Sequence, residues 1–317
     1  MTSTGNKIHN FQVCSILARE AAAAGATFLA LPECFNFLGG HWRETIDAAE
    51  PLSGPSMVRY RNLAKEHGLW LSLGGFQETV GIAPGAASDA AGDRRDAHTA
   101  VSRESGDPGP GSSSSSTGKV FNTHVIISGT GDILAAYRKI HLFDVDVPGG
   151  AVLKESRFTK PGRDVVVCKD TPAGHLGLST CYDVRFPEMY ACLAAGEAQA
   201  ILVPSAFTVP TGRAHWEVLL RARAIETQAY VIAAAQVGKH NEKRESYGHS
   251  LVVDPWGRVL ADAGEEDSPC IRVAEIDFGE LENVRGRMPI REHRRAAGSI
   301  FAQQLLEEID PPGKSSL

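Results

Sequence analysis

The chain has 317 residues, 43% of them hydrophobic, which is enough for one large buried core. Its net charge of −6 argues against a nucleic-acid partner, because duplex binding rests on clustered Lys and Arg. The two short basic runs, KHNEKR (239–244) and EHRR (292–295), are mixed with acids and His and are interpreted as solvated surface. These features favour a single-domain protein with small-molecule partners.

No stretch approaches the roughly 18 apolar residues of a membrane span, and the N-terminus has neither a signal-peptide nor a transit-peptide pattern, so we expect no membrane partner. The eleven His residues form no HxH or HExxH pattern, so no metal site is expected. Six cysteines without CxxC spacing indicate a reducing compartment. We predict a cytoplasmic location, and a mitochondrial form stays open if the true N-terminus lies upstream. The cysteines are Cys14, Cys34, Cys168, Cys181, Cys192 and Cys270.

Helical and strand patterns alternate along the first half of the chain. The first helix places Phe11, Cys14, Leu17, Ala18 and Ala21 on one face. Gly129, Thr130 and Gly131 predict the turn of a hairpin. The expected elements are a helix at 10–24, a strand at 26–31, a helix at 56–67, a strand at 69–76, and the hairpin at 122–128 and 132–138.

The second half continues the alternation, which predicts a mixed α/β sandwich. The expected strands are 164–168, 175–179, 200–204, 230–236, a 247–260 hairpin and 270–276, with helices at 187–195 and 213–227. We assign 1–300 to one domain and 301–317 to a C-terminal tail. Residues 81–118 contain almost no large apolar side chains and a serine run, so they are predicted to be a disordered insertion.

Three reactive residue types occur at three predicted strand ends. Cys181 lies in GLSTCYDVRFPE, where a strand turns sharply into a helix and backbone N–H groups would point at whatever the side chain attacks. Glu33 ends LALPE, and Lys139 follows AAYR. A lone cysteine is usually a small buried hydrophobe, but these three together predict an active site.

The three residues suit nucleophilic catalysis on a carbonyl carbon. A thiol needs a neighbouring base, and Glu33 can take its proton; burial is expected to raise the Glu33 pKa. Lys139 would favour the thiolate and, with the backbone N–H of Tyr182, form an oxyanion hole. The expected cycle passes through a thioester on Cys181 and uses no cofactor.

The PE pair, the RKxHLF segment and CYDxRFPE resemble the signature of the nitrilase, or carbon-nitrogen hydrolase, superfamily, from Asn6 to about Arg295. HGLWLSLGGF, PSAFTVPTGRAHWEVLLRARAIETQ and HNEKRESYGHSLVVDPWG are most similar to its deaminated glutathione amidases. The resemblance implies a four-layer αββα sandwich and a linear-amide hydrolase. True nitrile hydrolases generally carry Trp after the nucleophile, so Tyr182 favours an amidase.

Further residues are candidates for the site, and among them the resemblance implies the role of Glu155. Glu155 would hold the lysine and orient the substrate, and Tyr182 would line the pocket. Arg185 would pair with a substrate carboxylate or tie its helix to a nearby carboxylate, and Ser205 and Phe207 would contact the substrate. A homodimer or larger homo-oligomer is implied through 213–227 and YGHSLVVDPWG, with Arg221 and Arg223 facing the partner or the rim of the site. A short strand is implied just before Met1, so we expect Met1 to be an internal start; the alternative is a truncated form with an exposed sheet edge.

The resemblance implies hydrolysis of deaminated glutathione to 2-oxoglutarate and cysteinylglycine, as metabolite repair. Three alternatives stay open: an omega-amidase acting on 2-oxoglutaramate, a silent binding or scaffold homologue, and a thiol hydrolase in which His141 serves Cys181. The complete Glu, Lys and Cys set argues against the second. The absence of a papain-type CGSCW pattern argues against the third.

Overall fold

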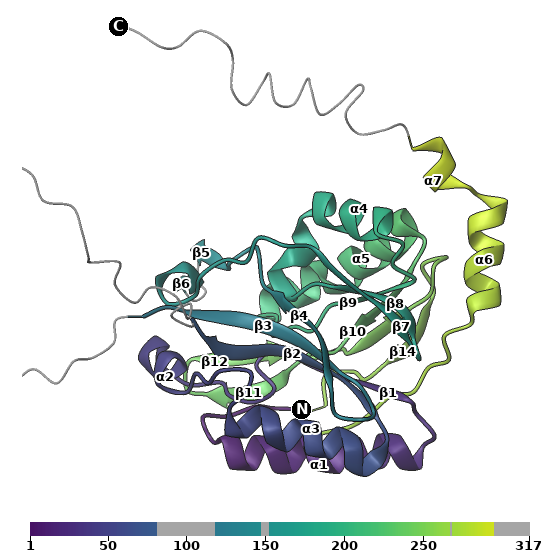
Figure 1. The fold of residues 1–317 in the computed structure, drawn as a ribbon. Coiled ribbons are helices and arrows are strands. Elements are labelled where there is room, and N and C mark those ends of the chain that lie inside the picture. Colours follow the sequence, from purple (N-terminus) through teal and green to yellow (C-terminus); the bar gives the residue numbers. More distant parts are fainter. Residues whose placement is uncertain (81–117, 147–151, 267, 295–317) are drawn as a thin grey trace, which may run out of the picture.

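The computed structural model describes residues 1–80, 118–146, 152–266 and 268–294, which form four layers (Figure 1). Helices α1 (Lys7–Ala23) and α3 (Pro55–His67) cover the outer face of a four-stranded sheet. A six-stranded sheet lies behind it, covered in turn by α4 (Pro187–Ala195) and α5 (Val209–Thr227). The expected αββα sandwich is confirmed.

The four-stranded sheet has the order β1-β2-β3-β4, with β1 parallel to β2 and the other pairs antiparallel. The register of β2 against β3 shifts between Leu73 and Phe76, at the two glycines Gly74 and Gly75. This bulge bends β2 where it passes the end of β1. The strands are β1 (Phe28–Leu31), β2 (Trp70–Thr79), β3 (Val120–Ile127) and β4 (Ile133–Arg138).

The six-stranded sheet has the order β14-β13-β10-β9-β8-β7, and its central strands β8, β9 and β10 are parallel. Parallel strands put their carboxyl ends at one edge of the sheet, where loops carry functional side chains. The strands are β7 (Val166–Thr171), β8 (Gly174–Leu178), β9 (Ala200–Leu202), β10 (Tyr230–Ala233), β13 (Leu251–Val253) and β14 (Val259–Asp262).

Two apolar clusters hold the layers together. One joins α1 and α3 to the four-stranded sheet through side chains such as Cys14, Leu17 and Tyr60. The other fills the six-stranded sheet's two faces, with Trp216 and Leu220 of α5 on one side and Tyr137 of β4 on the other. Burial of Cys14, Leu17, Ala18 and Ala21 confirms the predicted inner face of α1, whereas Phe11 is only half-buried.

Several short elements were not predicted from the sequence. Two hairpins, β5–β6 and β11–β12, lie near the four-stranded sheet, and α6 runs down the side of the molecule (Figure 1). Their bounds are α2 (Trp42–Asp47), β5 (Asp144–Asp146), β6 (Val152–Lys154), β11 (Val237–Asn241), β12 (Arg244–Tyr247), α6 (Phe278–Arg287) and α7 (Ile290–His293).

One predicted strand is wrong. Residues 270–276 have an apolar pattern, yet in the described chain they form no strand and join no ladder of backbone hydrogen bonds. The KHNEKR run is also not uniformly solvated, because His240 is buried. The predicted insertion at 81–118, apart from Gly118, and the tail at 301–317 lie outside the described residues.

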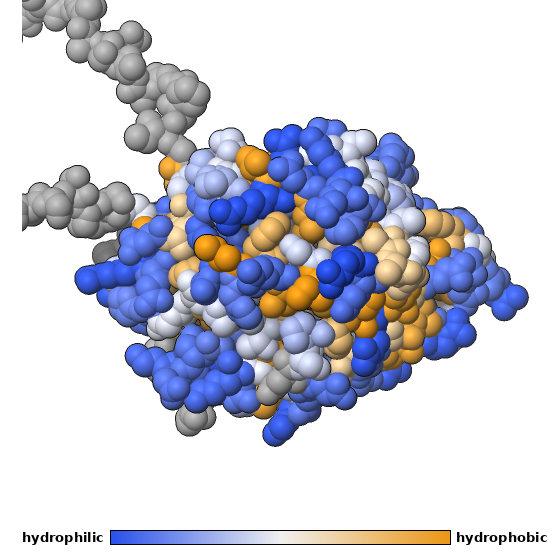
Figure 2. Space-filling model, turned by 90° about the horizontal axis from the view of Figure 1, so that it is seen from below, coloured by the Kyte–Doolittle hydropathy of each residue, from blue (hydrophilic) through white to orange (hydrophobic). Residues whose placement is uncertain are grey.

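The outer face formed by α1 and α3 is mainly hydrophilic, with hydrophobic residues gathered toward one side (Figure 2). Its exposed apolar side chains include Ile8, Ile16 and Val58. Among the described helices, none is long and apolar enough to cross a membrane.

Candidate active site

Glu33 follows β1 and is 3% exposed. Its Oε1 accepts hydrogen bonds from Lys139 Nζ at 3.0 Å and from Asn122 Nδ2 at 2.9 Å. Its Oε2 accepts one from the backbone N–H of Ala206 at 3.1 Å. The carboxylate is therefore fixed from three directions by groups from both sheets.

Lys139 follows β4 directly and is 2% exposed. Its Nζ lies 3.0 Å from Glu33 Oε1 and 2.9 Å from Glu155 Oε2. A buried ammonium is costly unless it is paired, and here two carboxylates compensate it. Lys139 is thus held as a cation between Glu33 and Glu155.

Glu155 begins a short 3₁₀ turn, Glu155–Arg157, and accepts a hydrogen bond from the backbone N–H of Phe143 at 2.8 Å. Asn122 Nδ2 donates to Glu155 Oε1 at 3.2 Å as well as to Glu33. Sequence reasoning missed Asn122. Its signal is a polar side chain in the otherwise apolar strand start VFN of β3.

Cys181 begins a 3₁₀ turn, Cys181–Arg185, between β8 and α4. Its backbone has φ +50°, a left-handed conformation that is costly for a residue with a Cβ, and its N–H donates to Pro204 O at 2.9 Å. Pro187 and Glu188 open α4 as predicted. The strained turn presents the thiol at the end of the central strand β8.

Asp183 and Arg223 hold this turn in place. Asp183 is fully buried and accepts hydrogen bonds from Thr180 N at 2.8 Å and Tyr137 Oη at 2.6 Å. Arg223 Nε donates to Val184 O at 2.9 Å. Arg223 is itself buried, so it does not present its side chain to a partner, whereas Arg221 is exposed.

The charges of the cluster set its protonation. Burial is the largest single effect on Glu33 and would raise its pKa, but the Lys139 ammonium, together with smaller effects of Arg244 and of a hydrogen bond with Cys181, lowers that pKa overall, contrary to the expected rise. Burial would lower the pKa of Lys139, and the carboxylates of Glu155 and Glu33 raise it instead. Burial and the Glu33 charge raise the pKa of the Cys181 thiol. The resting site therefore holds a neutral thiol beside an ionised base and an ammonium.

The other residues predicted for the site, Tyr182, Arg185 and Ser205, differ in their contacts. Tyr182 packs edge-on against Phe143 at 4.9 Å, and in the described chain its backbone N–H has no acceptor. Arg185 lies over the rings of Tyr182 and Phe207 and contacts His215, and among the described residues it pairs with no carboxylate. Ser205 is fully buried and donates its hydroxyl to Val203 O.

His141 is occupied elsewhere. Its Nδ1 lies 2.8 Å from Asp183 Oδ1, and its ring stacks on Phe186 at 3.7 Å. The charged groups that act on the Cys181 thiol are instead Glu33 and Lys139. Within the described ranges, no cluster of three His, Cys, Asp or Glu residues is placed to hold a metal ion.

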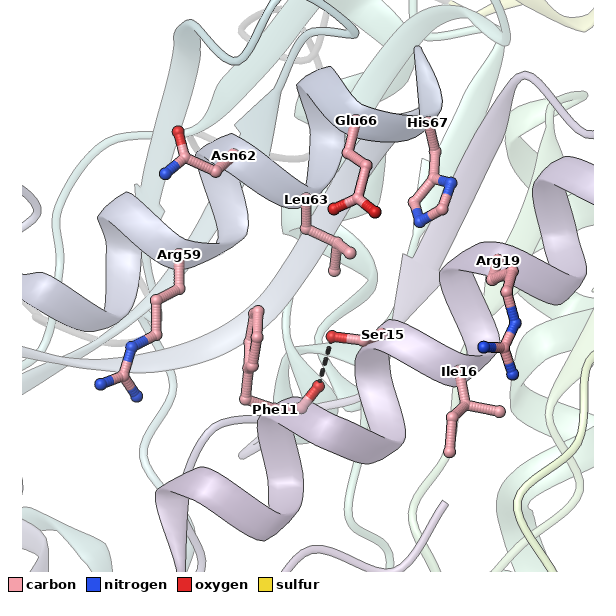
Figure 3. Close-up of a pocket in the computed structure, with 9 residues that line it drawn as sticks. All are labelled: Phe11, Ser15, Ile16, Arg19, Arg59, Asn62, Leu63, Glu66 and His67. Carbon is pink, nitrogen blue, oxygen red and sulfur yellow. Dashed lines mark hydrogen bonds between the residues drawn. The ribbon is translucent and has the colours of Figure 1, made fainter.

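A groove of about 370 Å³ lies between α1 and α3, on the outer face (Figure 3). Arg19 and Arg59 reach outward at its two ends, and Phe11 and Leu63 lie between them (Figure 3). None of its lining residues belongs to the Glu33, Lys139 and Cys181 cluster. The groove is therefore separate from the candidate active site.

A four-layer sandwich with a buried Glu, Lys and Cys at its strand ends defines a class of thiol hydrolases. The carbon-nitrogen hydrolase family model matches residues 1–286, and the chain belongs to that family. It is a hydrolase of carbon-nitrogen bonds other than peptide bonds.

Relatives share most of the chain. The deaminated glutathione amidase of Homo sapiens is 45% identical, over 93% of this chain and 80% of its own length. The protein of that name from a Synechocystis strain is 39% identical, over 93% and 95%. These likenesses extend well beyond the three catalytic motifs.

Solved structures agree. The Caenorhabditis elegans NitFhit protein has a TM-score of 0.75 and 43% identity over 93% of this chain, which spans only 63% of that fusion chain. Saccharomyces cerevisiae Nit3, a member of branch 10 of the nitrilase superfamily, has a TM-score of 0.71 and 28% identity, over 93% of both chains.

Proposed function

We propose that this chain is an amidase that hydrolyses deaminated glutathione to 2-oxoglutarate and cysteinylglycine, as metabolite repair. The observation that carries the proposal is the joining of Glu33, Lys139 and Cys181 in one buried cluster, in a chain 39–45% identical to proteins of that name. It acts without a cofactor.

Acylation uses the protonation described above. Glu33 takes the thiol proton as Cys181 Sγ attacks the amide carbon, so the sulfur-carbon bond forms as the carbonyl becomes an oxyanion. The backbone N–H of Tyr182 and Lys139 Nζ stabilise that oxyanion. Protonated Glu33 then gives its proton to the amine nitrogen, the carbon-nitrogen bond breaks, and a thioester remains on Cys181.

In deacylation, water is the nucleophile and Cys181 is the leaving group. The Glu33 carboxylate takes a proton from water as the hydroxide attacks the thioester carbon. Collapse of the second tetrahedral intermediate breaks the sulfur-carbon bond, and Cys181 recovers its proton from Glu33. Glu155 and Asn122 take no proton; they hold Lys139 and Glu33 in register.

The test is to compare kcat/KM for deaminated glutathione and for 2-oxoglutaramate, whose leaving group is ammonia. We expect deaminated glutathione to be preferred. A preference for 2-oxoglutaramate by about tenfold or more would move the chain to the omega-amidases, since a difference of ~1.4 kcal/mol can come from one contact. Turnover of neither compound, with no thioester trapped on Cys181, would favour the scaffold alternative.

We further propose a cytoplasmic homodimer or larger homo-oligomer. The support is a set of exposed apolar side chains on α5 and the β13–β14 turn, namely Val218, Ile225 and Trp256. Surfaces of this composition are typical of subunit contacts.

A further inference from the structure

The β11–β12 hairpin is fastened over two loops that build the site. Asn241 Nδ2 donates to Gly39 O at 3.3 Å, in the segment that follows Glu33. Tyr247 N donates to Phe207 O at 3.0 Å, next to the Ala206 N–H that binds Glu33. Figure 1 shows β11 and β12 beside α2 and beneath β2. The hairpin thus lies at the Glu33 side of the site.

Arg244 occupies the inward face of this hairpin. Side chains alternate along a strand, so Arg244 shares a face with Ser246, which is buried and bonded to His240 Nε2 at 2.8 Å. Glu245, on the opposite face, is exposed, whereas Arg244 is half-buried. Within the residues that the structure describes, the Arg244 guanidinium has neither an ion pair nor a hydrogen-bond acceptor.

The charge of Arg244 reaches the active site. Burial raises the pKa of Glu33, and Lys139 lowers it; Arg244 also lowers it, by less than Lys139 does. Burial likewise raises the pKa of Cys34, and the Arg244 charge opposes that rise. Arg244 therefore lies within electrostatic reach of the catalytic base Glu33.

We propose that Arg244 is a specificity residue that binds a carboxylate on the amine, or leaving-group, side of the substrate. Glu33 must protonate the departing nitrogen, so the amine leaves toward Glu33 and toward the hairpin. The inference rests on the proposed function, in which the leaving group is cysteinylglycine with a terminal carboxylate. Arg185 is a separate cation, which lies over the rings of Tyr182 and Phe207.

The experiment uses Arg244→Gln with Lys239→Gln as control, because Lys239 is an exposed cation on the same hairpin. Three substrates are compared: deaminated glutathione, its C-terminal carboxamide, and 2-oxoglutaramate. We expect Arg244→Gln to lower kcat/KM for deaminated glutathione by about 10- to 100-fold, mainly through KM, the range for one lost charge-assisted contact. We expect a change of less than about 2-fold for 2-oxoglutaramate, which lacks that carboxylate.

The carboxamide substrate tests whether Arg244 recognises the carboxylate itself. The wild type should prefer the acid to the amide, and Arg244→Gln should lose that preference. Equal losses on all three substrates, or an acid preference that survives in Arg244→Gln, would overturn the inference and leave the proposed function intact. Failure of the wild type to turn over deaminated glutathione would overturn the proposed function and this inference with it. Unchanged melting temperatures of the variants exclude misfolding as the cause.

Discussion

Lys139 is held between two carboxylates, and its cation decides the charge state of the whole cluster. Removing it would leave Glu33 and Glu155 as unpaired neighbours in a buried site, which typically costs about 3–5 kcal/mol. We expect Lys139→Met to lower kcat by about 10² or more, because an oxyanion donor is also lost. Stopped assays of amide hydrolysis would measure the loss of kcat, and urea unfolding of the purified variant would measure the loss of stability. A near-normal kcat would contradict the role of Lys139 as an oxyanion donor.

Cys181 is the expected point of covalent attachment. Cys181→Ala should fold and lose all measurable amidase activity, while Cys192→Ala, exposed on α4, should retain it. Cys34 is a poorer control because it adjoins Glu33 and has φ +59°. Iodoacetamide adducts mapped by mass spectrometry provide the check; labelling elsewhere with activity kept would exclude Cys181.

Burial and, after it, the negative charge of Glu33 raise the pKa of Cys181 and so suppress thiolate formation before substrate arrives. Glu33→Gln removes that charge and keeps Lys139, so the pKa of Cys181 should fall and alkylation should begin at lower pH. Turnover should nevertheless drop by about 10² to 10⁴, since the base is gone. Rates of alkylation and of amide hydrolysis, measured from pH 6 to 10, would separate the change in the Cys181 pKa from the loss of the base. An alkylation profile identical to that of the wild type would contradict the charge effect.

At the scale of elements, the bulge in β2 brings Gly75 against the site. A Cβ on Gly75, which has φ +78°, would lie 2.8 Å from Glu33 Cγ and from Asn122 Oδ1. Gly25 has φ +79° but nothing within 4 Å, so Gly25→Ala carries the backbone strain alone. We expect Gly75→Ala to lose kcat and melting temperature well beyond Gly25→Ala. Equal losses in kcat would mean that Glu33 tolerates displacement.

The same elements mark what could be read from the sequence. Long periodic segments such as α1, α3 and α4, and the strands that deliver Glu33, Lys139 and Cys181, were predicted, because their patterns are local. The β11–β12 hairpin and Asn122 were not, since their importance arises only when β3 and distant loops meet at the site. The 270–276 strand failed because an apolar pattern says nothing about a hydrogen-bonding neighbour.

For the whole molecule, two buried histidines make stability depend on pH. Burial lowers the pKa of both His124 and His240 from 6.5 to about 4. The unfolded chain then binds more protons than the native one between pH 6.5 and 4, so stability falls as the pH falls through that window. Each residue contributes at most about 1.4 kcal/mol per pH unit. The free energy of unfolding in urea should be measured at pH 7, 5.5 and 4.5, with His9→Gln, a substitution at an exposed histidine, as the control. A free energy that does not change with pH would contradict the prediction.

Association belongs to this scale too. Val218 is 70% exposed and Trp256 55% exposed, which is unusual for side chains of that size. If α5 and the β13–β14 turn meet a second copy, light scattering at micromolar concentration should give at least a dimer, and Val218→Lys should shift it toward monomer. A wild-type monomer would refute the proposal.

The residues that build the active site are divided between the two sheets. Glu33, Asn122 and Lys139 come from the four-stranded sheet, whereas Cys181 comes from the six-stranded one. Direct ties across the interface include His124 Nδ1 to Ser179 O at 2.9 Å and Gln236 Nε2 to Glu33 O at 2.9 Å. Activity therefore depends on the alignment of the two sheets. A small displacement of one sheet over the other would separate Cys181 from Glu33, although both sheets and all the described helices would persist. Enzymatic turnover should therefore disappear at lower urea concentrations than the helical circular-dichroism signal.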